Sequence, residues 1–81
     1  MAKSLHTPAF EQFCALMVSL RENAGLTQVD VSLRLNRPQS FVSKYECGER
    51  RLDVVEFLEV CEALEVDPSC VVAQLREKVG K

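Results

Sequence analysis

Residues 27–47 read TQVDVSLRLNRPQSFVSKYEC and contain two short helical patterns with a break between them. The first pattern follows Thr27, a residue suited to cap a helix, and its apolar residues stand four apart. Asn36 and the arginine after it interrupt this pattern. Pro38 then favours the opening of a second helix, because its ring fixes φ near the helical value. The stretch therefore predicts two consecutive short helices joined by a tight turn.

The spacing of residues within this stretch is typical of a helix-turn-helix. Counted from Gln28 as the first residue, Ser32 is fifth, Asn36 is ninth, Val42 is fifteenth and Tyr45 is eighteenth. The fifth residue must be small because the two helices cross closely there. The ninth lies in a turn that favours left-handed backbone angles, which Asn tolerates. The fifteenth and eighteenth must be apolar to hold the second helix against the domain, so four constraints are met together.

The second helix of this unit has one apolar face and one polar face. At 100° per residue, Phe41, Val42 and Tyr45 cluster on one side and are predicted to face the core. The opposite arc carries Gln39, Ser40, Ser43, Lys44 and Cys47, with Glu46 at its edge. An amide, two hydroxyls and an ammonium group suit hydrogen bonding to base edges or phosphates. A solvated helix face is the alternative interpretation.

Three further helices are predicted from their start signals, and no strand is predicted. The starts are Thr7-Pro8, Asp53 with Glu56 three residues later, and Asp67-Pro68. Gly25 is expected to stop the first of these helices. The fold class is therefore all-α, a compact bundle of five short helices with the helix-turn-helix at the second and third. We expect one domain over residues 1–81, with a mobile N-terminus at 1–6.

The last two helices each carry an apolar stripe, and the two stripes are expected to make different contacts. The expected core stripe of the fourth helix is Val54, Phe57, Leu58, Cys61 and Leu64. The fifth helix, at about residues 68–79, presents Val71, Val72, Leu75 and Val79. These four residues exceed the needs of so small a core, so we expect them to divide between covering the first helix and forming a two-fold dimer interface.

Most of the chain resembles the Xre/Cro/cI-type helix-turn-helix family of phage and bacterial transcriptional repressors. The resemblance covers roughly residues 10–68. Its most specific parts are Leu26-Thr27-Gln28, the segment SKYECG at 43–48, and the helix end ALEV at 63–66. The resemblance implies a five-helix DNA-binding domain that acts as a homodimer on a palindromic operator in the major groove. Ser32 and Asn36 stand where the family usually has Ala and Gly.

The resemblance also implies roles for individual residues. The implied base-reading residues are Gln39, Ser40, Ser43 and Lys44, and the implied phosphate-contacting residues are Gln28, Arg37, Arg50 and Arg51. Arg21 and Glu46 resemble a family pair that forms a partly buried structural ion pair. Cys47 stands where a polar or basic residue often assists a phosphate contact, which predicts a weaker contact there.

The charge of the chain is divided between two regions. The net charge is −2. Residues 21–51 carry six basic and four acidic side chains, whereas residues 52–81 carry three basic and seven acidic ones. Because screening limits the reach of surface charge to about 8 Å, a basic face can attract phosphates despite an acidic far side. The charge pattern is thus compatible with double-stranded DNA as the partner.

Enzymatic, metal and membrane functions find little support in the residue pattern. The four cysteines are 33, 14 and 9 residues apart and form no Cys-x-x-Cys pair, so Cys14 and Cys61 are interpreted as small core residues. His6 is the single histidine, which leaves no plausible catalytic triad. The row Glu56, Glu59, Glu62 and Glu65 is interpreted as a solvated face. We expect no enzyme activity, cofactor, small-molecule ligand or metal, and no membrane association. We expect a cytoplasmic protein encoded by a bacterium or a phage, which associates with the nucleoid when bound to DNA.

Two other functions remain open at this point. An antitoxin or a restriction-modification controller would share the fold and the DNA-binding surface. A protein-interaction module that has lost DNA binding is the rival from another class, and the acidic balance of the chain is its best support. The operator sequence and the sign of regulation do not follow from the residues.

Overall fold

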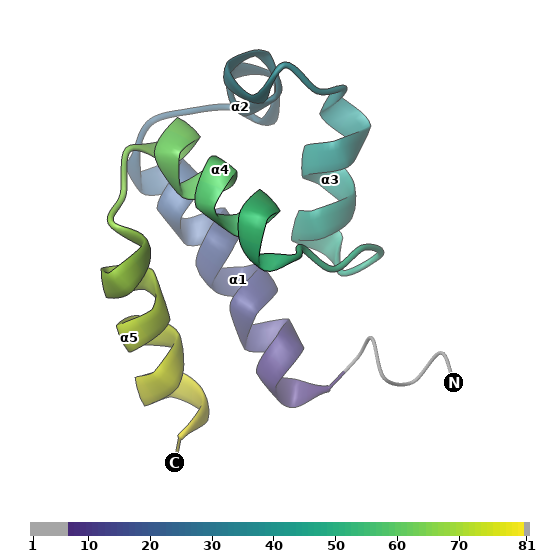
Figure 1. The fold of residues 1–81 in the computed structure, drawn as a ribbon. Coiled ribbons are helices and arrows are strands. Elements are labelled where there is room, and N and C mark those ends of the chain that lie inside the picture. The colour runs from purple at the N-terminus through teal and green to yellow at the C-terminus, as the bar shows by residue number, and fades with distance from the viewer. Residues whose placement is uncertain (1–6, 81) are drawn as a thin grey trace.

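The computed structural model describes residues 7–80, so the predicted mobility of residues 1–6 and the role of His6 lie outside the described residues. Five helices, and no strand among residues 7–80, make up the chain (Figure 1). They are α1 (Pro8–Asn23), α2 (Gln28–Leu35), α3 (Gln39–Cys47), α4 (Val54–Leu64) and α5 (Pro68–Val79). The all-α, five-helix prediction is confirmed.

Four of the five helices begin at the residues that the start signals predicted. The side chains of Thr7, Thr27, Asp53 and Asp67 each accept a hydrogen bond from a backbone N–H of the first turn. In α2 and α4 the bond is reciprocated by the residue three positions later, which forms a capping box. The start of α3 differs slightly from the prediction: Pro38 is extended and precedes the helix, and its side chain makes no capping bond.

The hydrophobic core receives side chains from every helix. Seven are almost completely buried, namely Met17, Val31, Val42, Tyr45, Val60, Cys61 and Val71. α1 packs against α3 and α5, and α2 packs against α3 and α4. In Figure 1, α5 lies beside α1 at one end of the molecule, while α2 and α3 stand at the other. This arrangement leaves one side of α3 open.

The core stripe of α4 is rotated relative to the prediction. Cys61 and Leu64 are buried as expected, and Phe57 packs partly buried against the core. Val54 is 74% exposed and Leu58 is also exposed, while Val60 and Ala63 are buried in their place. Because α4 is apolar around most of its circumference, the spacing alone did not decide which side faced inward.

The four apolar residues of α5 divide between core and surface. Val71 is buried in the monomer, and Leu75 packs partly buried against the core. Val72 and Val79 are exposed. Val71 therefore falls on the core side of the expected division, and a dimer contact through the exposed residues of α5 stays a prediction.

Candidate nucleic-acid interface

The turn between α2 and α3 has the geometry that the spacing predicted. Asn36 ends α2 in the left-handed region with φ 57° and ψ 44°. The Arg37 N–H donates to the Ser32 carbonyl at 3.0 Å, which closes the turn. Ser32 is buried, and its hydroxyl donates to the Val29 carbonyl at 2.7 Å. A larger side chain at position 32 would push the two helices apart.

The two faces of α3 separate as predicted. Phe41, Val42 and Tyr45 are buried, and the Phe41 and Tyr45 rings meet edge to face with their centroids 5.5 Å apart. On the other side Gln39, Ser40, Lys44 and Cys47 are exposed, and Ser43 is half-buried. The open side of α3 therefore carries all four of the predicted base-reading residues.

A buried ion pair joins α1 to α3. The Arg21 guanidinium donates to both carboxylate oxygens of Glu46, from Nε at 2.7 Å and from Nη2 at 3.1 Å. Its Nη1 donates to the carbonyl of Leu26 at 3.0 Å, in the loop before α2. The side chain of Arg21 is only 14% exposed and that of Glu46 only 5%. The bonds to Glu46 raise the pKa of Arg21, so the Arg21 guanidinium stays charged in this contact between α1 and α3.

A chain of side-chain hydrogen bonds connects this ion pair to the start of α3. Gln28 donates from Nε2 to Glu46 Oε1 at 3.0 Å. Gln39 donates from Nε2 to Gln28 Oε1 at 3.3 Å. Gln39 is exposed, yet its amide is oriented by Gln28, which in turn is bonded to the buried Glu46. This linkage holds one exposed amide in a fixed position at the open end of α3.

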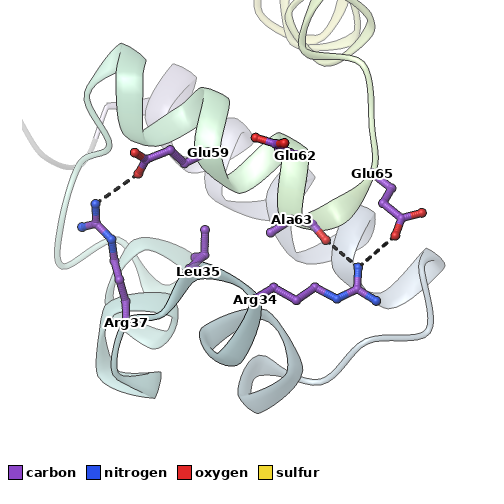
Figure 2. A pocket seen from close by; sticks show the side chains of 7 residues that line it. All are labelled: Arg34, Leu35, Arg37, Glu59, Glu62, Ala63 and Glu65. Carbon is purple, nitrogen blue, oxygen red and sulfur yellow. Dashed lines mark hydrogen bonds and ion pairs between the residues drawn. The ribbon is translucent and has the colours of Figure 1, made fainter.

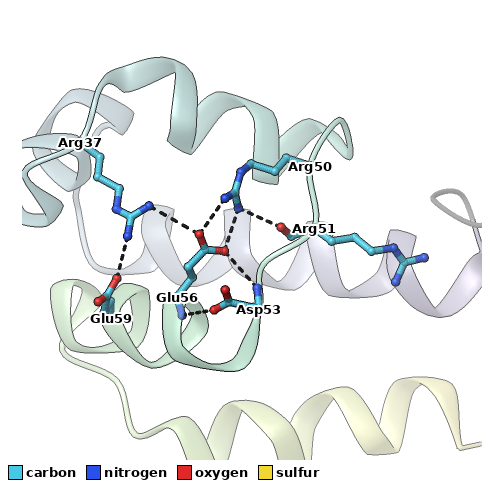
Figure 3. A network of polar contacts seen from close by, with 6 residues as sticks. All are labelled: Arg37, Arg50, Arg51, Asp53, Glu56 and Glu59. Atoms are coloured by element: carbon cyan, nitrogen blue, oxygen red, sulfur yellow. Dashed lines mark hydrogen bonds and ion pairs between the residues drawn. The ribbon is translucent and has the colours of Figure 1, made fainter.

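Two of the predicted phosphate-contacting arginines are engaged with α4. Arg50 donates from Nη1 and Nη2 to the two oxygens of Glu56, at 2.8 and 2.7 Å (Figure 3). Arg37 lies 3.6 Å from Glu56 and donates to Glu59 at 3.1 Å. Both guanidiniums stack on the Phe41 ring, 4.5 Å (Arg37) and 4.8 Å (Arg50) from its centroid. The sequence did not reveal these partners, since they come from a helix that the local pattern could not place.

Arg51 and Lys44 are both exposed, whereas Arg37 and Arg50 are half-buried against α4. Arg51 is exposed, and its guanidinium stacks on the Phe10 ring at 4.5 Å from the centroid. Lys44 is exposed in the second turn of α3. Together with Gln28 at the start of α2, they place polar and cationic groups around the open side of α3.

The glutamate row of α4 is only partly the solvated face that its spacing indicated. Glu56 is 13% exposed, and its bonds from Arg50 and from the Asp53 N–H hold its pKa at about 2. A groove between α2 and α4 contains Glu59, Glu62 and Glu65 (Figure 2). In that groove Arg34 donates to Glu65 at 3.3 Å and to the Ala63 carbonyl at 2.7 Å. The acidic row is thus largely a partner for arginines of the helix-turn-helix.

The four cysteines divide into two buried and two exposed thiols, with no disulfide between them. Burial raises the pKa of Cys14 and raises that of Cys61 to about 11. We therefore expect a thiol reagent to label Cys47 and Cys70 rapidly in the folded protein, and all four thiols in denaturant. Mass spectrometry of the labelled peptides measures this directly. Rapid native labelling of Cys61 would contradict the core described above.

Within residues 7–80 there is no cluster of three metal-ligating side chains, and no helix in that range is long and apolar enough to cross a membrane. The open side of α3 presents groups that form hydrogen bonds and carry charge. Amides, hydroxyls and cations lie on and around the exposed side of α3, a helix of nine residues. Such a surface can recognise a polyanion that presents hydrogen-bonding groups in a groove.

Comparison with known proteins agrees with this geometry. The family model of the helix-turn-helix domain matches residues 12–75. An XRE-family like protein from Pseudomonas syringae pv. tomato str. DC3000 is 40% identical and has a TM-score of 0.85, with 96% of this chain and 95% of that one covered. A comparison with curated proteins finds no match.

Two restriction-modification controller proteins are also similar in fold. C.AhdI from Aeromonas hydrophila is 25% identical with a TM-score of 0.74, and 80% of this chain and 98% of that one are covered. C.Esp1396I, solved as a tetramer in complex with its natural 35 base-pair operator, is 20% identical with a TM-score of 0.83, and the coverage is 94% and 100%. The fold and the site thus define a helix-turn-helix DNA-binding domain. The chain belongs to the XRE-type helix-turn-helix family.

Proposed function

We propose that this protein is a sequence-specific transcriptional repressor that binds a palindromic operator in the major groove as a homodimer. The observation that carries the proposal is the open side of α3, where Gln39 is exposed and yet oriented through Gln28 by the buried Arg21–Glu46 pair. A side chain held in this way loses little conformational entropy when it binds a base edge. Such a regulator would work in the cytoplasm, at the DNA itself.

The proposed base-reading residues differ in the bases that they suit. Gln39 can bond N6 and N7 of adenine together, and Lys44 suits O6 and N7 of guanine. Ser40 and Ser43 can bond a base or a phosphate. Because Gln39 begins α3 and Lys44 lies in its second turn, they would read different base pairs of one half-site.

The proposed phosphate contacts surround this reading helix. Gln28 and Arg51 lie at the start of α2 and after α3, where a duplex seated on α3 would pass. Arg37 and Arg50 were predicted for the same role, but pairing with Glu56 competes with any phosphate for their donors. Gln28 likewise donates to Glu46, so affinity would depend more on the exposed cation of Lys44.

DNA binding is tested by titrating the protein with random-sequence duplex at low salt and by selecting bound sequences from a random pool. We expect a selected site with two-fold symmetry and half-sites about one helical turn apart, or 34 Å. Lys44→Ala and Arg51→Ala should each weaken binding and reduce its salt dependence. Absence of binding, or unchanged binding by both variants, would favour the protein-interaction module instead.

The dimer contact that the structure supports best is an apolar patch made of Val54, Val55, Leu58 and Val72. All four are exposed. Val54 and Val72 line one groove between the start of α4 and α5, with Phe57 and Val71 at its base. A patch that spans two helices suits a two-fold contact better than one row of α5, because each copy can insert its side chains into the groove of the other.

Charging this patch should separate the two copies. We expect Val72→Lys to convert the dimer to a monomer, because a buried ammonium group without a partner is costly. Sedimentation or light scattering measures the change. Val29→Lys is the matched control, since Val29 is also exposed but lies on α2, away from the patch. A Val72→Lys protein that remains dimeric would place the interface elsewhere.

A further inference from the structure

Glu56 collects more donors than the cap of a helix requires. Its carboxylate accepts two hydrogen bonds from Arg50 and one from the Asp53 N–H at 3.0 Å, and Arg37 lies 3.6 Å away. The Asp53 bond alone completes the capping box of α4. The contacts of Glu56 with the two guanidiniums are therefore not needed for the cap of α4.

The two arginines come from opposite ends of the exposed helix. Arg37 lies just before α3 and Arg50 just after it, and both converge on Glu56 (Figure 3). Both guanidiniums also stack on the Phe41 ring. Arg50 is held in a two-bond, charge-assisted pair, the strong form of such contacts. Arg37 is shared between Glu56 and Glu59. The charges of these four side chains cancel.

We propose that Glu56 limits the affinity for DNA of any sequence by withholding Arg37 and Arg50 from the phosphate backbone. This inference rests on the proposed function. A phosphate contact strengthens binding to every sequence equally, because it carries no base information. Two arginines held by a carboxylate of the same protein add nothing to non-specific affinity. Glu56 therefore lowers the affinity for specific and non-specific duplex by the same factor, and the ratio of the two affinities depends on the base-reading residues alone.

The physical signature of a released arginine is its salt dependence. Each phosphate that a cation neutralises makes the slope of log K against log salt steeper by about 0.9. If both arginines are released, the slope for random duplex should therefore steepen by about 2, and by about 1 if only Arg50 finds a phosphate. A role of Glu56 in folding alone would not change this slope.

Glu56→Gln is the appropriate variant, because glutamine also serves as the third residue of a capping box and can still accept from the Asp53 N–H. We expect this variant to bind random duplex roughly tenfold more tightly at low salt, with the steeper slope. Its affinity for the selected site should rise by the same factor, because the added phosphate contacts carry no base information. The ratio of specific to non-specific affinity therefore stays unchanged.

Two controls separate release of the arginines from a general loss of negative charge. Glu62→Gln makes the same charge change further along α4, in the groove of Figure 2, and should leave the slope unchanged. The double variant Glu56→Gln/Arg50→Gln restores the net charge of the wild type. We expect it to lose most of the gain in affinity for random duplex.

The outcomes distinguish this inference from the function on which it rests. If the wild type binds duplex and Glu56→Gln binds random duplex with the same slope and affinity, the inference is wrong and the proposed function stands. If neither protein binds any duplex, both fail. If Glu56→Gln does not fold, a measurement on the wild type still tests the inference. The guanidinium NMR signals of Arg50 should keep their positions when random duplex is added. A shift of these signals on binding would overturn the inference.

Discussion

Replacement of Glu46 by alanine should lower the free energy of unfolding by about 3 kcal/mol, because the removal of one partner from a buried ion pair leaves the other charge uncompensated. Arg21 would keep its bond to the Leu26 carbonyl but lose both bonds to Glu46, at 14% exposure of its side chain. Gln28 would lose its acceptor as well. A domain of this size has only about 5 to 15 kcal/mol of stability, so the loss is a large fraction of the total.

Chemical denaturation followed by circular dichroism measures this effect. The matched control is Glu49→Ala, an exposed acid three residues further on, which should change stability by less than about 0.5 kcal/mol. Glu46→Gln should fall between the two, since its amide oxygen can still accept one of the bonds from Arg21 or Gln28. Equal stability of the Glu46→Ala and Glu49→Ala proteins would show that the pair contributes nothing net.

The fold was predictable from the sequence where the requirement is local. Asn36 shows this at the turn, because a left-handed residue at the ninth position of the unit leaves few alternatives to a helix-turn-helix. The caps at Thr27 and Asp53 depend on residues three positions apart and were likewise predictable. The side of α4 that faces the core was not, since Val54 and Val60 are equally apolar and only the packing of α1, α2 and α5 decides between them.

The candidate site divides in the same way. The exposure of Gln39 and Lys44 follows from the wheel of α3 once Val42 and Tyr45 are assigned to the core. The partners of the arginines do not, because Arg37 and Glu59 are 22 residues apart and meet only when α4 has docked. Arg50 and Glu56 are six residues apart across a bend, where no helical period links them. These charge pairs depend on the tertiary structure, and the sequence indicated Glu56 only as a capping residue and as part of a solvated row.

Gln39→Ala should lower the affinity for the selected site more than any other substitution while leaving the affinity for random duplex unchanged. A bidentate contact to a base contributes about 1 to 3 kcal/mol of discrimination, which corresponds to a roughly 5- to 150-fold loss of affinity for the selected site. Affinity for random duplex should remain unchanged, since a neutral amide releases no counterions. The preference for one base pair in each half-site should relax, and a second selection from the random pool measures this.

Gln28→Ala tests whether the orientation of Gln39 matters, because it removes the acceptor at 3.3 Å that holds the Gln39 amide. We expect a weaker preference at the same base pair as in Gln39→Ala, together with a loss of affinity for selected and random duplex alike, because Gln28 is also a proposed phosphate contact. Gln74→Ala, an exposed glutamine on α5, is the matched control and should alter neither affinity nor preference. If Gln39→Ala weakens binding to selected and random duplex by the same factor, Gln39 contacts the backbone, and the reading of sequence must come from Ser40, Ser43 and Lys44.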